Sequence, residues 1–482
     1  MMETFMRRMR EYDAVHFVGI GGIGMSALAE ILLASGIRVS GSDLRENGNV
    51  RRLITGGARI HLGHRAEHIA DARVVVFSSA IDPANPEIIE ARRRGIPLVS
   101  RADMLGVLMR TREGIALAGA HGKTTTSAML AEILLAADRD PTLVIGGIMN
   151  ALGSNARLGR GDALVAEADE SDGSFIKLCP THAVVTNIDP EHMDYYQREE
   201  NLYRAFTDFI DRVPFYGCVA ICIDDPMLDR IAAALDRPCV SYGFSPWADV
   251  RATGLRCRGL ETAFAVHHRG TPLGDLRLPL PGRHNVTNAL GASALALELG
   301  IPWPTIERAL STFRGVKRRL EIKGEAGGIL FVDDYAHHPT ELRATLRTLK
   351  EAFADRRMVT LFQPHRFTRT RDLFSDFVSA FGESDVVLIA PIYTAGEAEI
   401  PGIDSDALVQ SIASAGHPHV IGVSGHRDIQ TRLDQILRPG DVFVTLGAGD
   451  IWREGEYHRE KREAAEMHTL PRETETREDS GK

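Results

Sequence analysis

This sequence has few cysteines, no long apolar run and no excess of positive charge. Five cysteines in 482 residues, without a paired CxxC spacing, argue against a zinc site and against a disulfide framework, so we expect buried thiols. No run approaches the ~20 apolar residues that cross a bilayer, and the first residues lack the apolar core of a signal sequence. These absences predict a cytoplasmic protein without membrane insertion. The cysteines are Cys179, Cys218, Cys222, Cys239 and Cys257.

The charge balance limits the partners that the chain can bind. A formal net charge of −9 argues against nucleic acid, because phosphate backbones are bound through an excess of Lys and Arg. Anionic small molecules must then be bound by local clusters of positively charged groups. Hydrophobic residues make up 44% and charged residues 25%, which is close to globular averages, and the length suggests about three domains.

Strand-like and helix-like segments alternate along most of the chain, which predicts an α/β protein with parallel sheets. Residues 14–20 and 37–43 are predicted strands on either side of a helix over 25–36. The basic stretch 314–328 is a predicted linker, because hydrophobic periodicity lapses there. The charged stretch 454–482 is predicted to be a frayed helix or a disordered tail. We therefore expect domains over 1–111, 112–316 and 317–455, followed by a tail over 456–482.

Gly19-Ile20-Gly21-Gly22-Ile23-Gly24 fits GxGxxG between a predicted strand and helix, and Asp43 follows 19 residues later at the end of the next strand. Glycines allow a diphosphate to approach the backbone, and the helix N-terminus offers unpaired N–H groups. Any diphosphate would be held equally well. The motif alone leaves NAD, FAD, a UDP-sugar and an empty tight turn open.

A second glycine motif indicates a phosphate-binding loop. Gly119-Ala120-His121-Gly122-Lys123-Thr124-Thr125 lies between a buried strand and a helix. Its backbone N–H groups can surround phosphates, its lysine can neutralise β/γ oxygens and its first threonine can bind Mg²⁺. Two residues separate the glycines where GxxxxGK[ST] has four. Acidic groups and a histidine follow later strands, as expected for a Mg-ATP site: Glu167, Asp169, Glu170, Asp172 and His192.

Several long stretches carry a resemblance to a known family. The chain resembles the Mur ligases from about residue 13 to residue 452. The resemblance implies a Rossmann-like N-terminal domain for a UDP-sugar, a central P-loop ATPase domain and a Rossmann-like C-terminal domain that binds an amino acid. The matching stretches include HFVGIGGIGMSALAE, AGAHGKTTTSAM, AEADESDGSF, TNIDPEHMDYY, PGRHNVTNALGA, VDDYAHHPTE and FQPHRFTRT.

The resemblance also implies roles for individual residues. Lys123, Glu167 and His192 would be catalytic, and Thr124, Glu167 and His192 would hold Mg²⁺. ATP would be bound by residues of the phosphate loop, of the segment 284–288 and of the hinge region: Gly119, Ala120, His121, Gly122, Lys123, Thr124, Thr125, His284, Asn285, Asn288, Arg319 and Asp334. The UDP-sugar would be bound by Gly21, Ile23, Asp43, His64, Ser78 and Ser79, and the amino acid by Tyr335, His365 and Arg369.

The activity implied is the joining of L-alanine to the carboxylate of UDP-N-acetylmuramate in peptidoglycan precursor synthesis, with ATP and Mg²⁺ and through an acyl phosphate. A monomer or a homodimer is expected. Two alternatives stay open at this point. A sister ligase would attach a recycled tripeptide to the same UDP-sugar, and a non-catalytic UDP-sugar sensor would use ATP only as a conformational signal.

The sequence departs from the family's pattern in one informative way. Several sister Mur ligases use a carboxylated lysine after the metal-binding histidine as a further Mg²⁺ ligand. This chain has no lysine from Leu178 through Val316, and Phe206 lies near the place where one is expected. The absence predicts activity that does not depend on bicarbonate.

Overall fold

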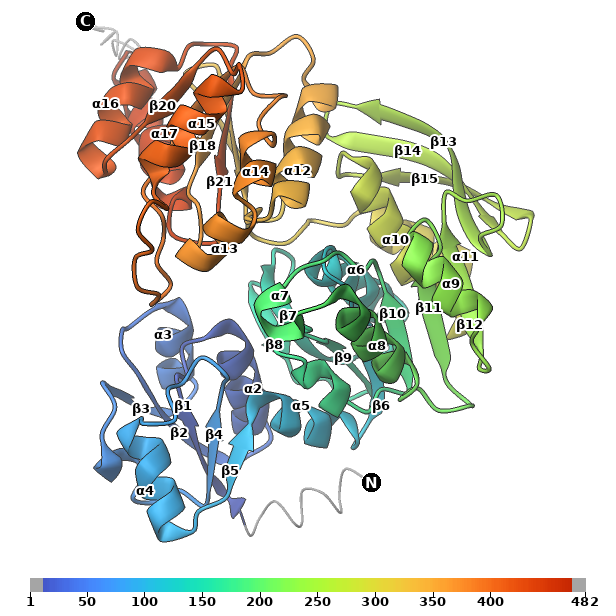
Figure 1. Cartoon of the computed structure of the whole chain (residues 1–482). Helices are drawn as coiled ribbons and strands as arrows, with labels where there is room; N and C mark the ends of the chain where they lie inside the picture. The colour runs from blue at the N-terminus through green and yellow to red at the C-terminus, as the bar shows by residue number, and fades with distance from the viewer. Residues whose placement is uncertain (1–11, 470–482) are drawn as a thin grey trace, which may run out of the picture. The chain divides into compact units, whose positions relative to one another are not determined.

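The computed structural model describes residues 12–469, with the side chains of 467–469 left out. The chain divides into two compact units, which meet in sequence at Lys317 and Arg318 and are described separately (Figure 1). The first unit contains two sheets and the second unit contains one. The predicted α/β class with mainly parallel sheets is confirmed. Within the described residues, no helix is both long and apolar enough to cross a membrane.

The N-terminal sheet has five parallel strands in the order β3-β2-β1-β4-β5. Its central strand β1 is buried along its whole length, as its apolar sequence predicts. The strand order reverses beside β1, and α/β sheets bind ligands at the carboxyl ends of the strands next to such a point, a place that we call the crevice. The elements are β1 (Ala14–Val18), α2 (Ile23–Ala34), β2 (Arg38–Asp43), α3 (Gly48–Thr55), β3 (Arg59–Leu62), η2 (Ala66–Ile69), β4 (Val74–Phe77), α4 (Pro86–Arg94), β5 (Leu98–Ser100) and α5 (Arg101–Met109).

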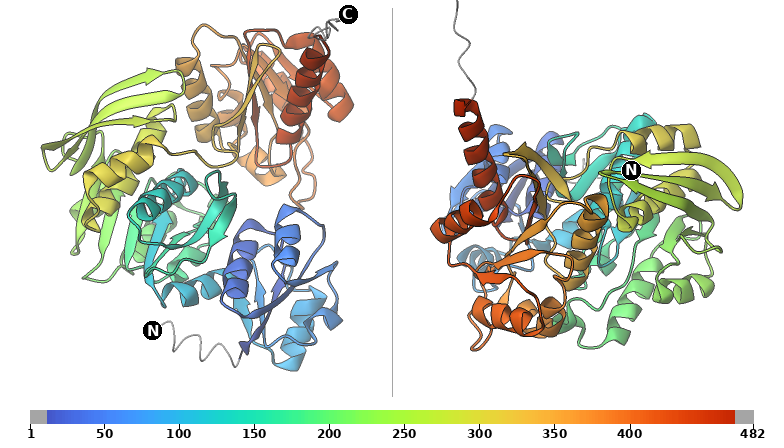
Figure 2. Two further views of the ribbon diagram at one scale, coloured as in Figure 1. Left: turned by 180° about the vertical axis from the view of Figure 1, so that it is seen from behind. Right: turned by 90° about the horizontal axis from the view of Figure 1, so that it is seen from above.

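The central sheet has ten strands in the order β15-β14-β13-β12-β11-β10-β6-β9-β7-β8, and the run from β13 to β7 is parallel. An antiparallel hairpin forms one edge, and Figure 2 shows it beside α10 and α11. The elements are β6 (Glu113–Ala118), α6 (Lys123–Ala136), β7 (Thr142–Met149), β8 (Ser154–Arg157), β9 (Ala163–Glu167), η3 (Ser174–Lys177), β10 (His182–Val185), α7 (Met193–Tyr196), α8 (Glu199–Ile210), β11 (Cys218–Cys222), α9 (Pro226–Ala233), β12 (Cys239–Gly243), β13 (Val250–Arg258), β14 (Glu261–His268), β15 (Thr271–Leu278), α10 (Arg283–Glu298) and α11 (Trp303–Ser311).

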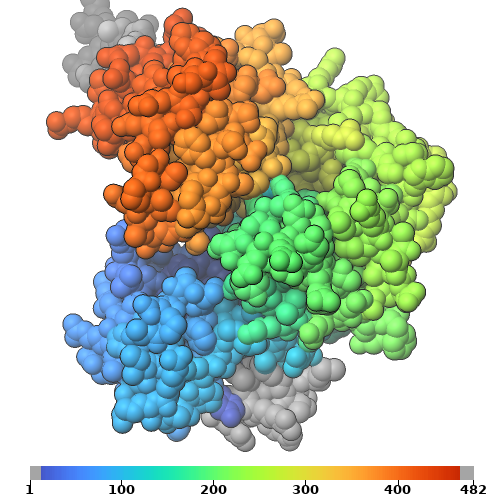
Figure 3. Space-filling model, viewed as in Figure 1, coloured from blue at the N-terminus to red at the C-terminus, as the bar shows by residue number. Residues whose placement is uncertain are grey.

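The first unit holds its two sheets together by packing and by polar contacts. Helix α2 lies against β7 and β8, and Arg101 of α5 pairs with Asp169 at 3.0 Å. Arg52 of α3 donates a hydrogen bond to Asn155 at 3.2 Å. In the space-filling view the surface of the N-terminal sheet region (blue) meets that of the central region (cyan to green) (Figure 3).

The second unit has a six-stranded sheet in the order β16-β17-β21-β18-β19-β20, parallel except for β16. Its elements are β16 (Glu321–Ala326), β17 (Ile329–Asp334), α12 (Pro339–Ala352), β18 (Met358–Phe362), α13 (Phe367–Asp372), α14 (Phe374–Val378), β19 (Val386–Ile389), α15 (Ser405–Ser414), β20 (Val420–Gly422), α16 (His426–Ile436), β21 (Val442–Leu446) and α17 (Trp452–Thr469).

Two expectations about this unit need correction. The predicted linker over 314–328 contains strand β16, which pairs antiparallel with β17 through a bulge between Ile322 and Gly324. An edge strand that is half-exposed has little apolar periodicity, so the pattern missed it. The helical alternative for the charged stretch is confirmed as far as residue 469, but helix α17 is not frayed there, because it packs on β16, β17 and β21 and buries Gly455 and His458. Residues 470–482 of that stretch lie outside the described residues.

The cysteines are all free, in agreement with the expected absence of disulfides. Cys218 and Cys222 are buried in β11, as predicted. Burial was wrongly expected for the others, since Cys179 and Cys239 are half-buried and Cys257 is exposed. Cys257 lies near the end of β13, in the antiparallel edge hairpin, where residues 254–258 of the strand are exposed.

Candidate active site

The phosphate loop joins β6 to α6 and depends on glycine at two positions. Gly119 has φ 136° and Gly122 has φ 82°, a region that favours glycine. A Cβ on Gly122 would also collide with Asn288. The loop is held from the neighbouring strand, because the N–H of His121 donates to Asn187 Oδ1 at 2.9 Å and the N–H of Ala120 donates to Asn187 O at 3.2 Å.

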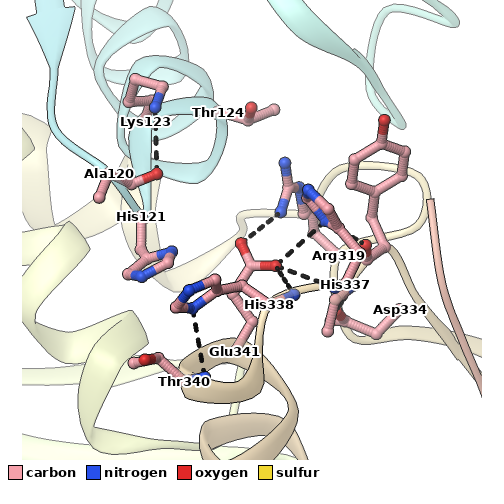
Figure 4. Close-up of polar contacts among 12 residues, drawn as sticks. Ala120, His121, Lys123, Thr124, Arg319, Asp334, His337, His338, Thr340 and Glu341 are labelled. Atoms are coloured by element: carbon pink, nitrogen blue, oxygen red, sulfur yellow. Dashed lines mark hydrogen bonds and ion pairs between the residues drawn. The ribbon is translucent and has the colours of Figure 1, made fainter. Parts of the chain in front are cut away.

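Lys123 is the first residue of α6 and lies in the loop. Its Nζ contacts Glu170 Oε2 at 2.7 Å and donates to the carbonyl of Gly119. It also donates to the carbonyl of Ala120 at 3.0 Å (Figure 4). Burial would lower the pKa of Lys123, but the carboxylate of Glu170 outweighs it and raises that pKa. Burial, together with Asp169, raises the pKa of Glu170 to about 7 in spite of the lysine. The ammonium group therefore stays charged at the mouth of the loop.

Glu167 ends β9 beside the first threonine of α6. The hydroxyl of Thr124 donates to Glu167 Oε2 at 3.1 Å, while the N–H of Gly146 and the hydroxyl of Ser127 donate to Oε1 at 2.5 and 3.3 Å. The hydroxyl and carboxylate oxygens are hard ligands of the kind that Mg²⁺ takes. The donor set fits a cation next to bound phosphates.

A second group of candidate ligands lies near the loop. One ligand atom from each of Glu170, Glu191 and His192 falls within 4.8 Å of the others. His192 has φ 57° and directly precedes α7. The rest of the acidic run is used elsewhere, because Asp169 pairs with Arg101 and Asp172 accepts from the N–H of Ser174. Sequence reasoning grouped the acidic run by its spacing, but only the fold shows which members face the loop.

The start of α10 lies behind the phosphate loop. Asn288 accepts from the hydroxyl of Thr126 at 3.2 Å, and Asn285 donates to Pro281 O at 2.8 Å. Both asparagines are buried. His284 is half-buried, and burial lowers its pKa to about 4, so its ring is neutral at pH 7. The structure thus brings Asn288 to the loop, while His284 stands at the N-terminus of the helix.

The glycine turn of the N-terminal sheet is fixed by Asp43. The N–H of Gly21 donates to Asp43 Oδ2 at 2.8 Å, and a Cβ on Gly21 would lie 2.9 Å from the same oxygen. Ile23 is 44% exposed at the start of α2, so it is accessible to a ligand. Ser78 and Ser79 follow β4, whose carboxyl end neighbours that of β1. These predicted ligand residues therefore lie at the crevice of the sheet.

In the second unit, Asp334 is buried at the end of β17. It accepts from the N–H groups of Leu320 at 2.6 Å and Ala336 at 2.7 Å, and burial raises its pKa to about 6. Arg319 lies 3.9 Å from Glu341, which also contacts His337 at 3.2 Å (Figure 4). The hinge arginine and Asp334 are brought to one end of this sheet.

Tyr335, His365 and Arg369 belong to one aromatic and basic cluster of the second unit. Arg369 Nη1 lies 3.3 Å from His365 Nδ1, and the ring of His337 lies 5.2 Å from Tyr335 and 5.9 Å from His365. Burial, aided by His337 and Arg369, lowers the pKa of His365 to about 3. The ring of this histidine is therefore neutral at pH 7.

Tyr393 belongs to the same cluster, although the sequence analysis did not select it. Its ring stacks on His365 with centroids 5.4 Å apart. It follows β19 at the carboxyl end of a parallel strand, beside the end of β18. Polar side chains after such strand ends are the signal that could have identified it.

Comparison with known proteins covers nearly the whole chain. Residues 14–113 match the Mur ligase family, catalytic domain, residues 117–296 match the Mur ligase middle domain, and residues 318–449 match the Mur ligase, glutamate ligase domain. The chain is 53% identical to a UDP-N-acetylmuramate-L-alanine ligase of Sorangium cellulosum, over 91% of this chain and 94% of that protein.

Solved structures give the same picture. A UDP-N-acetylmuramate-alanine ligase of Thermotoga maritima superposes with a TM-score of 0.82 at 30% identity, over 94% of this chain and 99% of that one. A UDP-N-acetylmuramate:L-alanyl-gamma-D-glutamyl-meso-diaminopimelate ligase of Neisseria meningitidis superposes with a TM-score of 0.59 at 28% identity, over 63% of this chain and 99% of that one.

Proposed function

Because this chain belongs to the Mur ligase family, we propose that it is the ATP-dependent ligase that joins L-alanine to UDP-N-acetylmuramate. The observation that carries the proposal is the likeness to alanine-adding ligases, which extends over 91% of the chain at 53% identity. The loop geometry supports it independently, since Lys123, Thr124 and Glu167 form a site for a nucleotide with Mg²⁺. The activity belongs to the synthesis of peptidoglycan precursors.

The first step transfers the γ-phosphoryl group of ATP to the carboxylate of the UDP-sugar. The carboxylate oxygen attacks phosphorus, ADP leaves, and the product is an acyl phosphate. Bound Mg²⁺ would offset charge on the phosphate oxygens. Lys123 would neutralise the β/γ oxygens, Thr124 and Glu167 would hold one cation, and Glu170, Glu191 and His192 offer ligands for another.

In the second step the amine of alanine attacks the acyl carbon and inorganic phosphate leaves. The amine must lose a proton, and His337 and His192 are the candidate acceptors. Arg369 would grip the carboxylate of alanine with two parallel hydrogen bonds, beside the stacked rings of His365 and Tyr393.

The UDP-sugar is assigned to the N-terminal sheet. The turn at Gly21, fixed by Asp43, presents backbone N–H groups at the N-terminus of α2, where a diphosphate is stabilised. Ile23, His64, Ser78 and Ser79 are the side chains that we assign to the same ligand. They follow the carboxyl ends of β1, β3 and β4, which supports this assignment.

A substrate panel tests the proposal. Phosphate release is measured with UDP-N-acetylmuramate, Mg-ATP and one of alanine, glycine, serine or the tripeptide L-alanyl-γ-D-glutamyl-diaminopimelate. We expect the highest kcat/KM with alanine and negligible turnover with the tripeptide. Preference for the tripeptide would identify the chain as the recycling ligase, and ATP binding without turnover of any acceptor would identify a sensor.

A further inference from the structure

A buried carboxylate beneath the N-terminal crevice is not explained by the roles given above. Glu87 is fully buried, and its side chain is surrounded by His16, His64, His68 and Ser42. It lies in the first turn of α4, where Asn85 caps the helix by accepting from the N–H of Glu87 at 2.9 Å. An ionised group in the interior is costly unless it is paired. The presence of a carboxylate at this buried position therefore needs an explanation.

The two oxygens of Glu87 have different partners. Oε1 accepts from the backbone N–H of Arg65 at 3.3 Å and from His68 Nδ1 at 2.9 Å. Oε2 accepts from the hydroxyl of Ser42 at 2.6 Å, and His16 Nε2 lies 3.6 Å from it. Although burial raises it, the nearby ring of His16 and the hydrogen bond from the Ser42 hydroxyl lower the pKa of Glu87 to about 2, so the side chain is a carboxylate at neutral pH.

Ser42 connects this carboxylate to the crevice in two ways. Its carbonyl accepts from the N–H groups of Gly19 at 2.8 Å and Ile20 at 3.0 Å, which fixes the start of the glycine turn. Its hydroxyl lies 2.9 Å from Nδ1 of His64, a residue that we assign to the UDP-sugar. Glu87, Ser42 and His64 thus form one hydrogen-bonded chain that runs from the interior to the crevice, and Nδ1 of His64 also lies 3.4 Å from Oε2 of Glu87.

The direction of the protons along this chain follows from the carboxylate. A carboxylate only accepts, and two acceptor oxygens 2.6 Å apart repel unless a proton lies between them, so the hydroxyl of Ser42 donates to Glu87. A hydroxyl has a single proton, so Ser42 must accept at its contact with His64. Nδ1 of His64 therefore carries a proton and faces Ser42, which leaves Nε2 on the other side of a half-buried ring.

We propose that Glu87 is a positioning residue of the UDP-sugar site, which acts through Ser42 to hold the ring of His64 with Nδ1 protonated and Nε2 directed to the ligand. The inference rests on the proposed function, because the UDP-sugar is its ligand. A carboxylate that fixes the proton and orientation of a histidine through a second hydrogen bond is a general device of ligand sites. His64 would make the contact, while Glu87 never touches the ligand.

The substitution Glu87→Gln makes a specific prediction about protons. The backbone N–H of Arg65 is a fixed donor, so the amide oxygen should take the place of Oε1 and the amide NH₂ should face Ser42. Ser42 would then accept from the amide and donate to His64. Nδ1 of His64 should change from protonated to unprotonated, although no atom of His64 has been altered.

Nitrogen chemical shifts of ¹⁵N-histidine-labelled full-length chain measure this change without any ligand, with the His64 signals assigned from a His64→Ala variant. A protonated Nδ1 in the native chain and an unprotonated Nδ1 in Glu87→Gln are the expected results. An unprotonated Nδ1 in the native chain, or no change in the variant, would overturn the inference. This arm does not depend on the proposed substrate.

Calorimetry with UDP-N-acetylmuramate supplies the second arm. Glu87→Gln should raise the Kd about 10-fold, because Nε2 changes from an acceptor to a donor and its hydrogen bond from an N–H or O–H of the ligand is lost, and it should leave the Kd of ATP unchanged. Glu90→Gln is the matched control, since Glu90 lies on the same helix and pairs with Arg93 away from the cluster. It should bind like the native chain. If the native chain fails to bind the UDP-sugar, the proposed function fails and the proton measurement still stands.

A purely structural role for Glu87 gives different results. In a His64→Ala background, Glu87→Gln should cause no further loss of UDP-sugar affinity if it acts through His64. A further loss of the same size would show that Glu87 only stabilises the domain. Should Glu87→Gln not fold, Ser42→Ala removes the bridging hydroxyl and leaves only the 3.4 Å approach of His64 to Glu87, while it keeps the carboxylate and the backbone carbonyl. It should weaken UDP-sugar binding as well, and native affinity in that variant would equally contradict the proposal.

Discussion

Lys123 and Glu170 form an ion pair, with Nζ 2.7 Å from Oε2, and both side chains are largely buried. The same ammonium donates to the carbonyls of Gly119 and Ala120, so it is held at the position where phosphates would enter. Breaking a buried ion pair by removing one partner is costly, because the remaining charge is left uncompensated. Loss of the lysine therefore has two separable consequences.

We predict that Lys123→Ala lowers turnover at least about 100-fold, because no other cation of the loop can replace its charge at the γ-phosphate. It should also lower the melting temperature, since Glu170 loses its partner. The double variant Lys123→Ala with Glu170→Gln should recover the melting temperature and remain inactive. Turnover near the native rate in either folded variant would remove Lys123 from the mechanism.

Arg369→Lys should raise the KM for alanine about 10-fold or more and change that for ATP little. A point charge cannot reproduce the two-pronged grip of a guanidinium on a carboxylate. Arg371→Lys on the same helix is the control, because Arg371 is paired with Asp372 at 2.7 Å and is exposed. Equal changes in both KM values for Arg369→Lys would place this arginine outside the amino-acid site.

Catalysis should not depend on bicarbonate. The chain has no lysine between Leu178 and Val316, and Phe206 is buried in α8 with its ring 5.3 Å from that of Phe175. A carboxylated lysine therefore has no place in this segment. Rates are compared after rigorous removal of CO₂ and after add-back. A rate that bicarbonate restores would reveal a carbamate from another part of the chain.

Helix α17 should make the stability of the second unit depend on pH through His458. Burial lowers the pKa of this histidine to about 4, and its Nδ1 donates to Gln430 at 3.0 Å. The unfolded chain binds the proton near the ordinary value of 6.5, so the neutral ring contributes stability above pH 6.5 that is lost as pH falls towards 4. The melting temperature of the native chain should exceed that of His458→Gln most at pH 7 and least at pH 4. His419→Gln, at an exposed position, should show no such trend, and a constant difference for His458→Gln would contradict the assignment.

Local patterns and long-range contacts differ in what the sequence can predict. The phosphate loop is a local motif, because Gly119 and Gly122 need positive φ values within a few residues of Lys123. Edge strands such as β16 have little hydrophobic periodicity, so the sequence pattern did not predict the pairing of β16 with β17 that the structure shows. The surroundings of Glu87 could not be predicted from the sequence for a different reason. Its partners come from four other segments, and a single glutamate on a helix carries no mark of the histidines that surround it.

Transfer of an isotope from substrate to phosphate tests the central claim most directly. UDP-N-acetylmuramate labelled with ¹⁸O in its carboxylate is incubated with Mg-ATP and alanine, and the released phosphate is examined by mass spectrometry. An acyl phosphate requires one carboxylate oxygen to leave with phosphorus, so we predict one ¹⁸O per phosphate, released only when alanine is present. Unlabelled phosphate, or phosphate released equally without alanine, would contradict the assignment of this chain as an amide-forming ligase.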